Sequence, residues 1–169
     1  PNIIKDMEIT EPNQVWVADI TYLKTWQGFC YLALITDVYS RKIVGGDLSQ
    51  SLSIEGSIRA LEMALEGVIK MPERFIHHSD RGVQYCSKDY IDLLKSHDIE
   101  ISMTEENHCY ENAIAERVNL TLKSEFLLGM HLASLEIAKE QVAQSIRIYN
   151  QERLHLSLDY QTPEHRYVY

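Results

Sequence analysis

Hydrophobic positions in the first third of the chain come in short runs that are rich in β-branched and aromatic residues. The runs are Val15–Leu23, Phe29–Thr36 and Lys42–Leu48, and polar turns separate them. Residues of these types favour strands, and short polar turns join neighbouring strands as hairpins. We therefore predict three antiparallel strands. The polar segment before them, residues 1–14, is interpreted as a linker or as the remainder of an N-terminal segment.

The spacing of apolar residues changes at Ser53. Apolar side chains then recur every three or four positions, which predicts an amphipathic helix that Ser53 caps and that ends before Pro72. A buried strand at Arg74–His78, a helix that begins at Ser87 and a strand at Ile99–Met103 follow. This order predicts an α/β fold.

The last third of the chain is mainly helical in pattern. A polar loop, Thr104–Glu111, leads into a helix within residues 111–126. Ser134 is in a position to cap a last long helix that reaches Asn150. The predicted order is three strands, then helix, strand, helix, strand, helix and a final helix.

Length and composition indicate one globular domain, which we place at residues 15–169. The hydrophobic content is 45% of 169 residues, enough for a substantial core. No apolar run approaches the length that spans a bilayer, so we expect no membrane contact and a cytoplasmic protein. The three cysteines show no CxxC spacing, which favours reduced thiols over disulfides.

Three acidic residues stand in unusual settings. Asp80 follows directly after the predicted strand at Arg74–His78, and Asp19 lies inside an apolar strand. A buried, unpaired carboxylate costs several kcal/mol unless it binds a cation, and a side chain at a strand end is held rigidly beside an open loop. Glu116, on the helix within residues 111–126, is the third acid. Taken alone, Glu116 fits a solvated helix acid; taken with the other two, it suggests one shared metal site.

The helix that carries Glu116 has two faces. Asn112, Glu116 and Lys123 share one face by their spacing. We expect the opposite stripe to pack inward; it consists of Ile114, Val118, Leu122 and Phe126.

Five ordered motifs resemble the catalytic core of a DDE transposase related to retroviral integrase, closest to the insertion-sequence-three family. Thirty-five residues lie between Asp80 and Glu116, an interval for which this family is known. The motifs are WVADITY around Asp19, ITDVYSRKIVG at 35–45, HHSDRGVQY around Asp80, ENAIAE ending at Glu116, and YNQERLHLSLDYQTP at 149–163.

The resemblance implies an RNase H-like fold, a mixed five-stranded sheet flanked by helices. It also implies an enzyme that cleaves DNA at transposon ends and transfers the 3′-hydroxyl to another phosphodiester. Two Mg²⁺ or Mn²⁺ ions would flank the scissile phosphate, with Asp19 between them and Asp80 and Glu116 each on one. The family further implies a multimer on DNA and an N-terminal helix-turn-helix region absent from this chain.

Further candidates surround the three acids. His78 would orient Asp80 or touch DNA, or else is an ordinary buried imidazole. Arg153 and His155 would contact phosphate or form a structural ion pair. The other candidates for contact with DNA or the acids are Arg81, Asn112 and Lys123.

Two other groups of residues favour bland interpretations. Asp37 fits a turn cap better than a metal ligand. The spacing of the remaining potential zinc ligands matches no zinc pattern; they are His77, His78, Cys86, His108 and Cys109.

Charge and sequence variation keep alternatives open. The net charge of −9 is unfavourable for nucleic acid, so we predict weak, salt-dependent binding of DNA by this chain. Glu111, Arg117 and Val118 stand where the family commonly has Asp, Ser and Phe. A stand-alone RNase H-like nuclease is one alternative. An inactive, domesticated domain that binds DNA or assembles with partners is another, and the intact acid triad argues against it.

Overall fold

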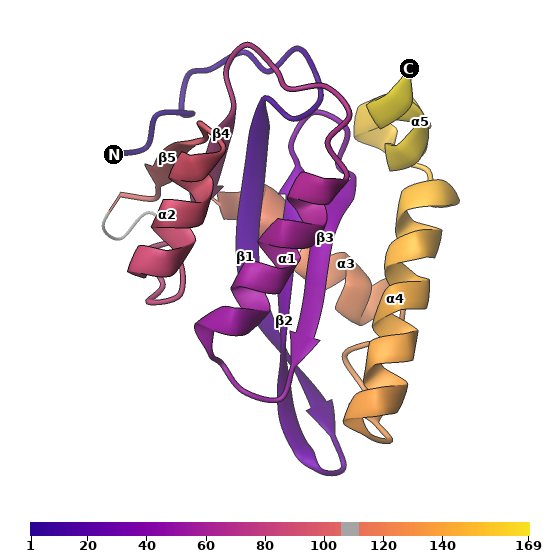
Figure 1. The fold of residues 1–169 in the computed structure, drawn as a ribbon. Helices are drawn as coiled ribbons and strands as arrows, with labels where there is room; N and C mark the ends of the chain where they lie inside the picture. The colour runs from indigo at the N-terminus through magenta and orange to yellow at the C-terminus, as the bar shows by residue number, and fades with distance from the viewer. Residues whose placement is uncertain (106–111) are drawn as a thin grey trace.

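The chain folds into a central sheet with helices on both faces (Figure 1). Our computed structural model describes residues 1–105 and 112–169. The strands are β1 (Val15–Thr25), β2 (Gly28–Asp37), β3 (Ile43–Ser49), β4 (Ile76–Ser79), β5 (Glu100–Met103) and β6 (His131–Leu132). The helices are α1 (Ile54–Glu66), α2 (Lys88–Ser96), α3 (Ala113–Glu125), α4 (Leu135–Gln151), the short 3₁₀ helix η2 (Leu156–Leu158) and α5 (Pro163–Val168).

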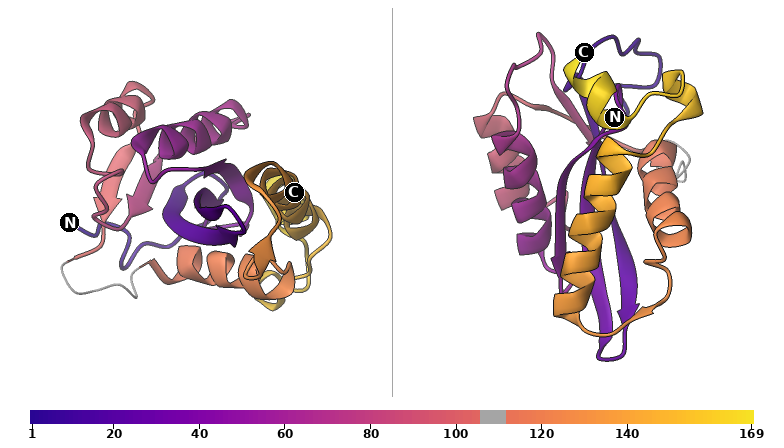
Figure 2. Two further views of the ribbon diagram at one scale, coloured as in Figure 1. Left: turned by 90° about the horizontal axis from the view of Figure 1, so that it is seen from below. Right: turned by 90° about the vertical axis from the view of Figure 1, so that its right-hand side faces the viewer.

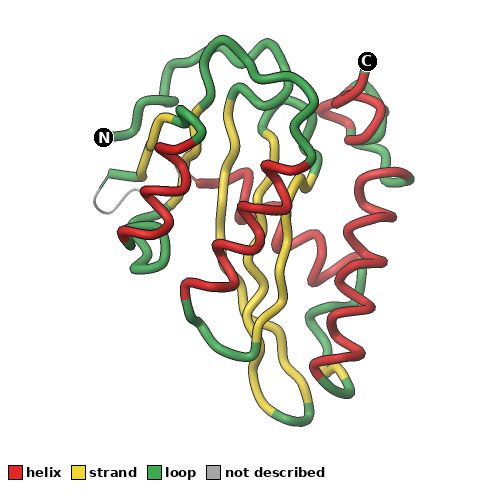
Figure 3. The backbone as a smooth tube through the Cα atoms, viewed as in Figure 1, coloured by secondary structure: helices red, strands yellow, loops and turns green. Residues whose placement is uncertain are grey.

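The sheet is mixed, with the strand order β3-β2-β1-β4-β5 (Figure 3). β1, β2 and β3 are antiparallel, as predicted, whereas β4 is parallel to β1 and β5 is parallel to β4. β6 is a sixth strand that pairs with the far end of β1. The prediction of five strands missed it because a two-residue strand has no room for an alternating pattern.

Helices cover both faces of the sheet (Figure 2). α1 and α2 lie on one face, where Trp16 and Ala18 of β1 join a cluster with Leu61 and Tyr90. α3 and α4 lie on the other face, against a cluster that includes Leu23 of β1. Since both faces of β1 are covered along its first half, Val15–Ala18 is an unbroken run of buried apolar residues instead of an alternating pattern.

Local signals set most of the helix ends. The side chains of Ser87 and Ser134 accept hydrogen bonds from backbone N–H groups in the first turns of α2 and α4, which confirms two predicted caps. Ser53 occupies the corresponding position before α1, but its side chain makes no such bond. In the described parts of the chain, no helix is both long enough and apolar enough to cross a membrane.

Both ends of the described chain pack against the sheet. Residues 1–14 form neither helix nor strand, yet Ile3, Ile4, Met7 and Ile9 pack on a third apolar cluster with Val15 and Val17. At the other end, the hydroxyl of Tyr167 donates to Oδ1 of Asn13 at 2.8 Å. α5, which the sequence pattern did not predict, is therefore anchored at the entrance to β1.

Candidate active site

Asp19 and Asp80 lie on neighbouring parallel strands at the same level. Ala18 of β1 pairs with Ser79, the last residue of β4. The next residue of each chain segment is an aspartate, and neighbouring strands lie about 4.8 Å apart. Both aspartates line a cavity of about 250 Å³. The sheet thus brings together two acids that are far apart in the sequence.

The surroundings of Asp19 strongly raise its pKa. Its side chain is half-buried, and Nδ2 of Asn119 on α3 donates to its Oδ2 at 2.7 Å. The pKa of Asp19 is raised to about 6, first by burial and then by the negative charge of Asp80, with a smaller contribution from Glu116. The bond from Asn119 acts in the opposite direction because it favours the carboxylate. Asp19 therefore senses both of the other acids.

Asp80 lies in the loop after β4 and is exposed. Its Oδ1 accepts a hydrogen bond from the backbone N–H of Gly82 at 2.9 Å. A Cβ on Gly82 would lie 2.9 Å from this same oxygen, so the absence of a side chain lets the loop close around Asp80.

Glu116 lies in the first turn of α3 and is exposed. Two asparagines fix the helix over β1. Nδ2 of Asn112 donates to the carbonyl oxygen of Ala18 at 3.0 Å, and Asn119 donates to Asp19. These contacts position Glu116 above the strand that carries Asp19.

Asn112 and the apolar stripe of α3 differ from expectation. Asn112 is buried as a structural tether and does not share an open polar face with Glu116. Val118 and Leu122 pack inward as predicted, whereas Ile114 and Phe126 are only partly buried. Asn119 was missed, because an asparagine within a helix carries no pattern that distinguishes a ligand-holding side chain from a surface one.

The three carboxylates are neighbours that are not gathered around one point. Among the described residues, no group of three or more His, Cys, Asp or Glu side chains is close enough to hold a metal ion. Asp80 and Glu116 are exposed, so their side chains are free of core packing. Carboxylate oxygens suit Mg²⁺ and Mn²⁺, and the mutual repulsion that raises the pKa of Asp19 is what a cation relieves. The donor set fits a divalent ion.

The candidate zinc ligands do not come together among the described residues, where no group of three or more His, Cys, Asp or Glu side chains could hold a metal ion. Two of these candidates, His108 and Cys109, lie outside the described residues. Asp37 is fully buried and accepts hydrogen bonds from the backbone N–H groups of Asn13 and Ser40, which confirms the turn cap.

The two histidines before Asp80 are interior residues. Nε2 of His77 lies 2.9 Å from the hydroxyl of Tyr90, and burial lowers the pKa of His77 to about 3. His78, on β4, is fully buried, with Nδ1 2.8 Å from Oγ of Ser102 on β5. The structure therefore shows His78 as a buried imidazole with no solvent-exposed surface.

Two basic residues lie beside the acids. Arg81 is exposed and donates from Nε to the carbonyl of Thr104 at 2.8 Å. Nζ of Lys123 lies 4.6 Å from the centre of the Tyr22 ring. Burial lowers the pKa of Lys123, while the charge of Asp19 acts to raise it.

Arg153 and His155 lie in the segment after α4, apart from the three acids. The guanidinium of Arg153 donates two hydrogen bonds of 2.6 Å to the carboxylate of Glu125. The pKa of His155 is lowered to about 4, first by burial and then by Arg153 and Arg41, so its ring is neutral at pH 7. Of the two earlier interpretations, the structure shows the ion pair.

Known families match nearly the whole chain. Two family models, both described as integrase core domain, match residues 9–109 and 97–163. The chain is 41% identical over 152 residues to the transposase InsF for insertion sequence IS3A of Escherichia coli K12, covering 89% of this chain and 52% of that protein. It is 39% identical over 160 residues to the insertion element IS600 uncharacterized 31 kDa protein of Shigella sonnei, covering 94% and 58%. The chain spans about half the length of the curated relatives it matches.

Solved structures show the same fold. One chain of the simian T-cell lymphotropic virus intasome in complex with the PP2A regulatory subunit B56 gamma superposes with a TM-score of 0.81 at 17% identity, covering 96% of this chain and 57% of that one. The HTLV-2 integrase catalytic core domain in complex with magnesium gives 0.74 at 18% identity, covering 95% and 99%. The RNase H-like fold predicted from the motifs is confirmed. Because one family model alone matches residues 9–109, more than half of the chain, the chain belongs to the integrase core domain family.

Proposed function

We propose that this chain is the catalytic core of a transposase that cleaves DNA at transposon ends and transfers the freed 3′ ends to another strand. The observation that carries the proposal is the register of β1 and β4. It sets Asp19 beside Asp80, and Glu116 on α3 adds to the same negative field. Family membership and the identity to a transposase support DNA as the substrate. A DNA-recognition region outside this chain and a multimer on DNA belong to the same proposal.

The acids would act as ligands for two Mg²⁺ or Mn²⁺ ions. Asp19, Asp80 and Glu116 would together hold these ions, since all three offer only hard oxygen donors. When bound, two such metal ions would activate the attacking oxygen and stabilise the leaving oxygen of a phosphodiester. Arg81, next to Asp80 in the chain, and Lys123, which the charge of Asp19 affects, would orient the phosphate.

The protonation of Asp19 should govern when the site can load. With a pKa of about 6, Asp19 is mainly protonated at pH 5 and mainly charged at pH 8 in the absence of metal. A cation competes with that proton for the carboxylate. Strand transfer should therefore fall as the pH decreases below about 6.

The decisive variant is Glu116→Gln. Glutamine keeps the size of the side chain and its helix propensity but loses the charge that would hold an ion. Joining of a pre-cleaved duplex end to target DNA should be abolished with both Mg²⁺ and Mn²⁺, while circular dichroism and the melting temperature stay unchanged. The assay should use the longest natural form of the protein that contains this chain.

Glu140→Gln is a matched control, because Glu140 is an exposed helical glutamate on α4. It should transfer strands at the wild-type rate. Near-normal transfer by Glu116→Gln would refute the assignment and favour the inactive DNA-binding or assembly domain. Hydrolysis without joining, by a wild-type protein, would favour the stand-alone nuclease.

A further inference from the structure

A second concave surface lies on the other flank of α3. A groove of about 960 Å³ is bounded by α3, by the C-terminal end of α4 and by the segment that follows it. In the right-hand view of Figure 2, this segment extends toward the first turns of α3. We call it the arginine groove, since its charged lining consists of Arg41, Arg117, Arg153 and Glu125.

The groove is separate from the acids. Arg117 and Thr121, one turn apart on α3, line it. Asn119 on the same helix points to Asp19 instead. None of the three acids lines the groove, although Glu116 and Arg117 are adjacent in sequence. α3 therefore presents Glu116 toward the flank of the acids and Arg117 toward the groove.

The charge balance of the groove is opposite to that of the chain. Three arginines face one glutamate there, in a chain with a net charge of −9. Glu125 is already occupied by Arg153 through two hydrogen bonds. His155, also in the lining, is neutral at pH 7. An excess of positive charge thus remains on Arg41 and Arg117.

These two arginines have donors to offer. Arg117 is exposed and makes no hydrogen bond or ion pair within the described part of the chain. Arg41 is half-buried and donates from Nη1 to the carbonyl of Val38 at 2.6 Å, which uses one of five N–H groups. Asp37, whose charge acts on Arg41, is occupied by backbone donors and by Ser40. A guanidinium in this state favours an oxyanion ligand.

We propose that the arginine groove binds the phosphodiester backbone of DNA, on the flank of α3 opposite the acids. The proposal rests on DNA being the substrate of the proposed function. A polyanion fits better than a small anion, because the groove is large and open and its arginines come from three separate segments. Exposed Leu154, Leu156 and Tyr160 at the same segment would also suit a protein partner, which the experiment must distinguish.

The test is metal-free binding of a fluorescent duplex of about 20 base pairs to the protein, measured by anisotropy over a series of salt concentrations in EDTA. Arg117→Gln should weaken binding several-fold at low salt and reduce the slope of log affinity against log salt by about 1. Arg117→Lys, which keeps the charge, should restore most of the slope. Adding Arg41→Gln to Arg117→Gln should reduce the slope further.

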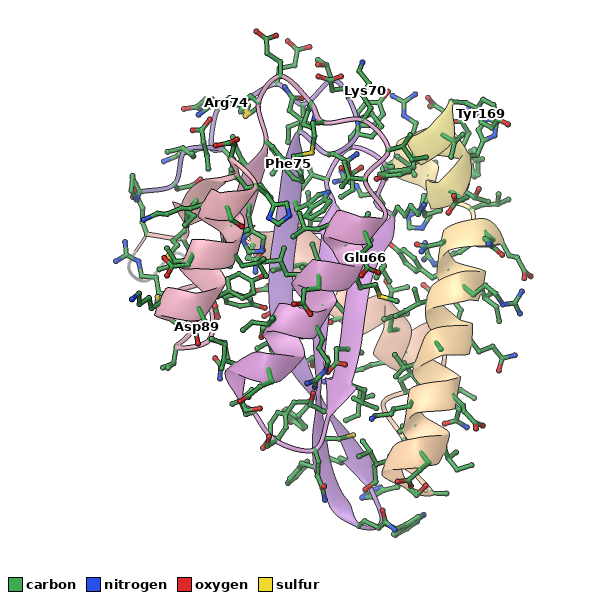
Figure 4. All side chains as sticks on the ribbon, viewed as in Figure 1. Glu66, Lys70, Arg74, Phe75, Asp89 and Tyr169 are labelled. Atoms are coloured by element: carbon green, nitrogen blue, oxygen red, sulfur yellow. The ribbon has the colours of Figure 1, made fainter. Side chains whose placement is uncertain are left out.

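Arg74→Gln is the matched control. Arg74 is an exposed arginine just before β4 that pairs with Glu100, the first residue of β5 (Figure 4). This variant removes the same charge and should leave the salt slope unchanged. Melting temperatures check that each variant is folded; Arg117 makes no described contact that would be lost.

The result that overturns the proposal is a salt slope for Arg117→Gln, alone and with Arg41→Gln, equal to that of Arg74→Gln. If those variants instead change the sedimentation of the protein without changing DNA affinity, the groove is a protein contact, and the proposal is equally wrong. Failure of this proposal is separable from failure of the proposed function, because binding in EDTA requires no chemistry at the acids.

Discussion

The two flanks of α3 are built in different ways. On the acid flank, Asn112 and Asn119 tie the helix to adjacent residues of a central strand, and Asp19 is part of that strand. On the arginine flank, the groove is lined by the turn that carries Arg41, by α3, by the end of α4 and by the segment after it, and the surface ion pair between Arg153 and Glu125 links that segment to α3. Chemistry needs tight placement, whereas attraction of a polyanion acts over several ångströms. The difference suggests that the acid flank would carry out the chemistry and the arginine flank would bind the DNA.

The largest expected effect is the difference in strand-transfer rate between a variant on the acid flank and a variant on the arginine flank. Asp80→Asn should reduce strand transfer by about 1,000-fold or more, since loss of an ion's ligand removes several kcal/mol of transition-state stabilisation. Arg117→Gln should reduce it only several-fold, through weaker DNA binding. Rates at saturating DNA measure the difference, because Arg117→Gln should then recover and Asp80→Asn should not. Equal losses would show that the flanks do not divide these tasks.

The next effect is stabilisation by metal. Saturating Mg²⁺ or Mn²⁺ should stabilise the wild type by about 2–3 kcal/mol at pH 8, a rise of several degrees in melting temperature. The rise should shrink at pH 5, where a pKa of about 6 leaves Asp19 largely protonated. Asp80→Ala should abolish it at both pH values. An unchanged rise in Asp80→Ala would locate the bound metal elsewhere.

A smaller effect tests the asparagine ties. Asn119→Ala should destabilise the protein by about 1–2 kcal/mol, the range for a largely buried hydrogen bond to a carboxylate. It should also raise the pKa of Asp19 above about 6, because the removed bond favours the charged form. Carboxyl ¹³C NMR titration measures the pKa, and urea unfolding measures the stability. Ser124→Ala removes an exposed hydroxyl on α3 and serves as the control that should change neither.

The smallest effect is a gain in stability from removing the charge of Asp19. Asp19→Asn should stabilise the metal-free protein by about 1 kcal/mol at pH 8. The folded pKa of Asp19 is raised from 3.8 to about 6, so the folded state binds more protons, and stability falls as the pH rises through that window. At pH 4 or below the gain should vanish. Urea unfolding at both pH values measures it, and a loss of stability at pH 8 would contradict the inferred cost of holding a charged Asp19 that is partly buried and next to Asp80.

The sequence predicted the parts of the fold that have their own local pattern. β1 to β3 appear as apolar runs, and Asp19 was conspicuous because it interrupts one. Glu116 could be singled out only through the motif spacing, since exposed glutamates on helices are common and carry no signal of their own. β6 and η2 are too short for any period. The arginine groove could not be predicted, because Arg41, Arg117 and Arg153 meet only through tertiary packing.

Residue 19 and residue 80 also differ in how freely they can move. β1 extends for eleven residues through the middle of the sheet, whereas β4 stops after four, so Asp19 is held in a strand and Asp80 in a loop. Glu116 is likewise exposed at the start of its helix. Asp19 would therefore be a ligand fixed by the sheet, whereas the exposed side chains of Asp80 and Glu116 would adjust their rotamers to hold an ion. Under the proposed function, this contrast divides the site into one ligand whose place the fold sets in advance and two whose places a bound metal would set.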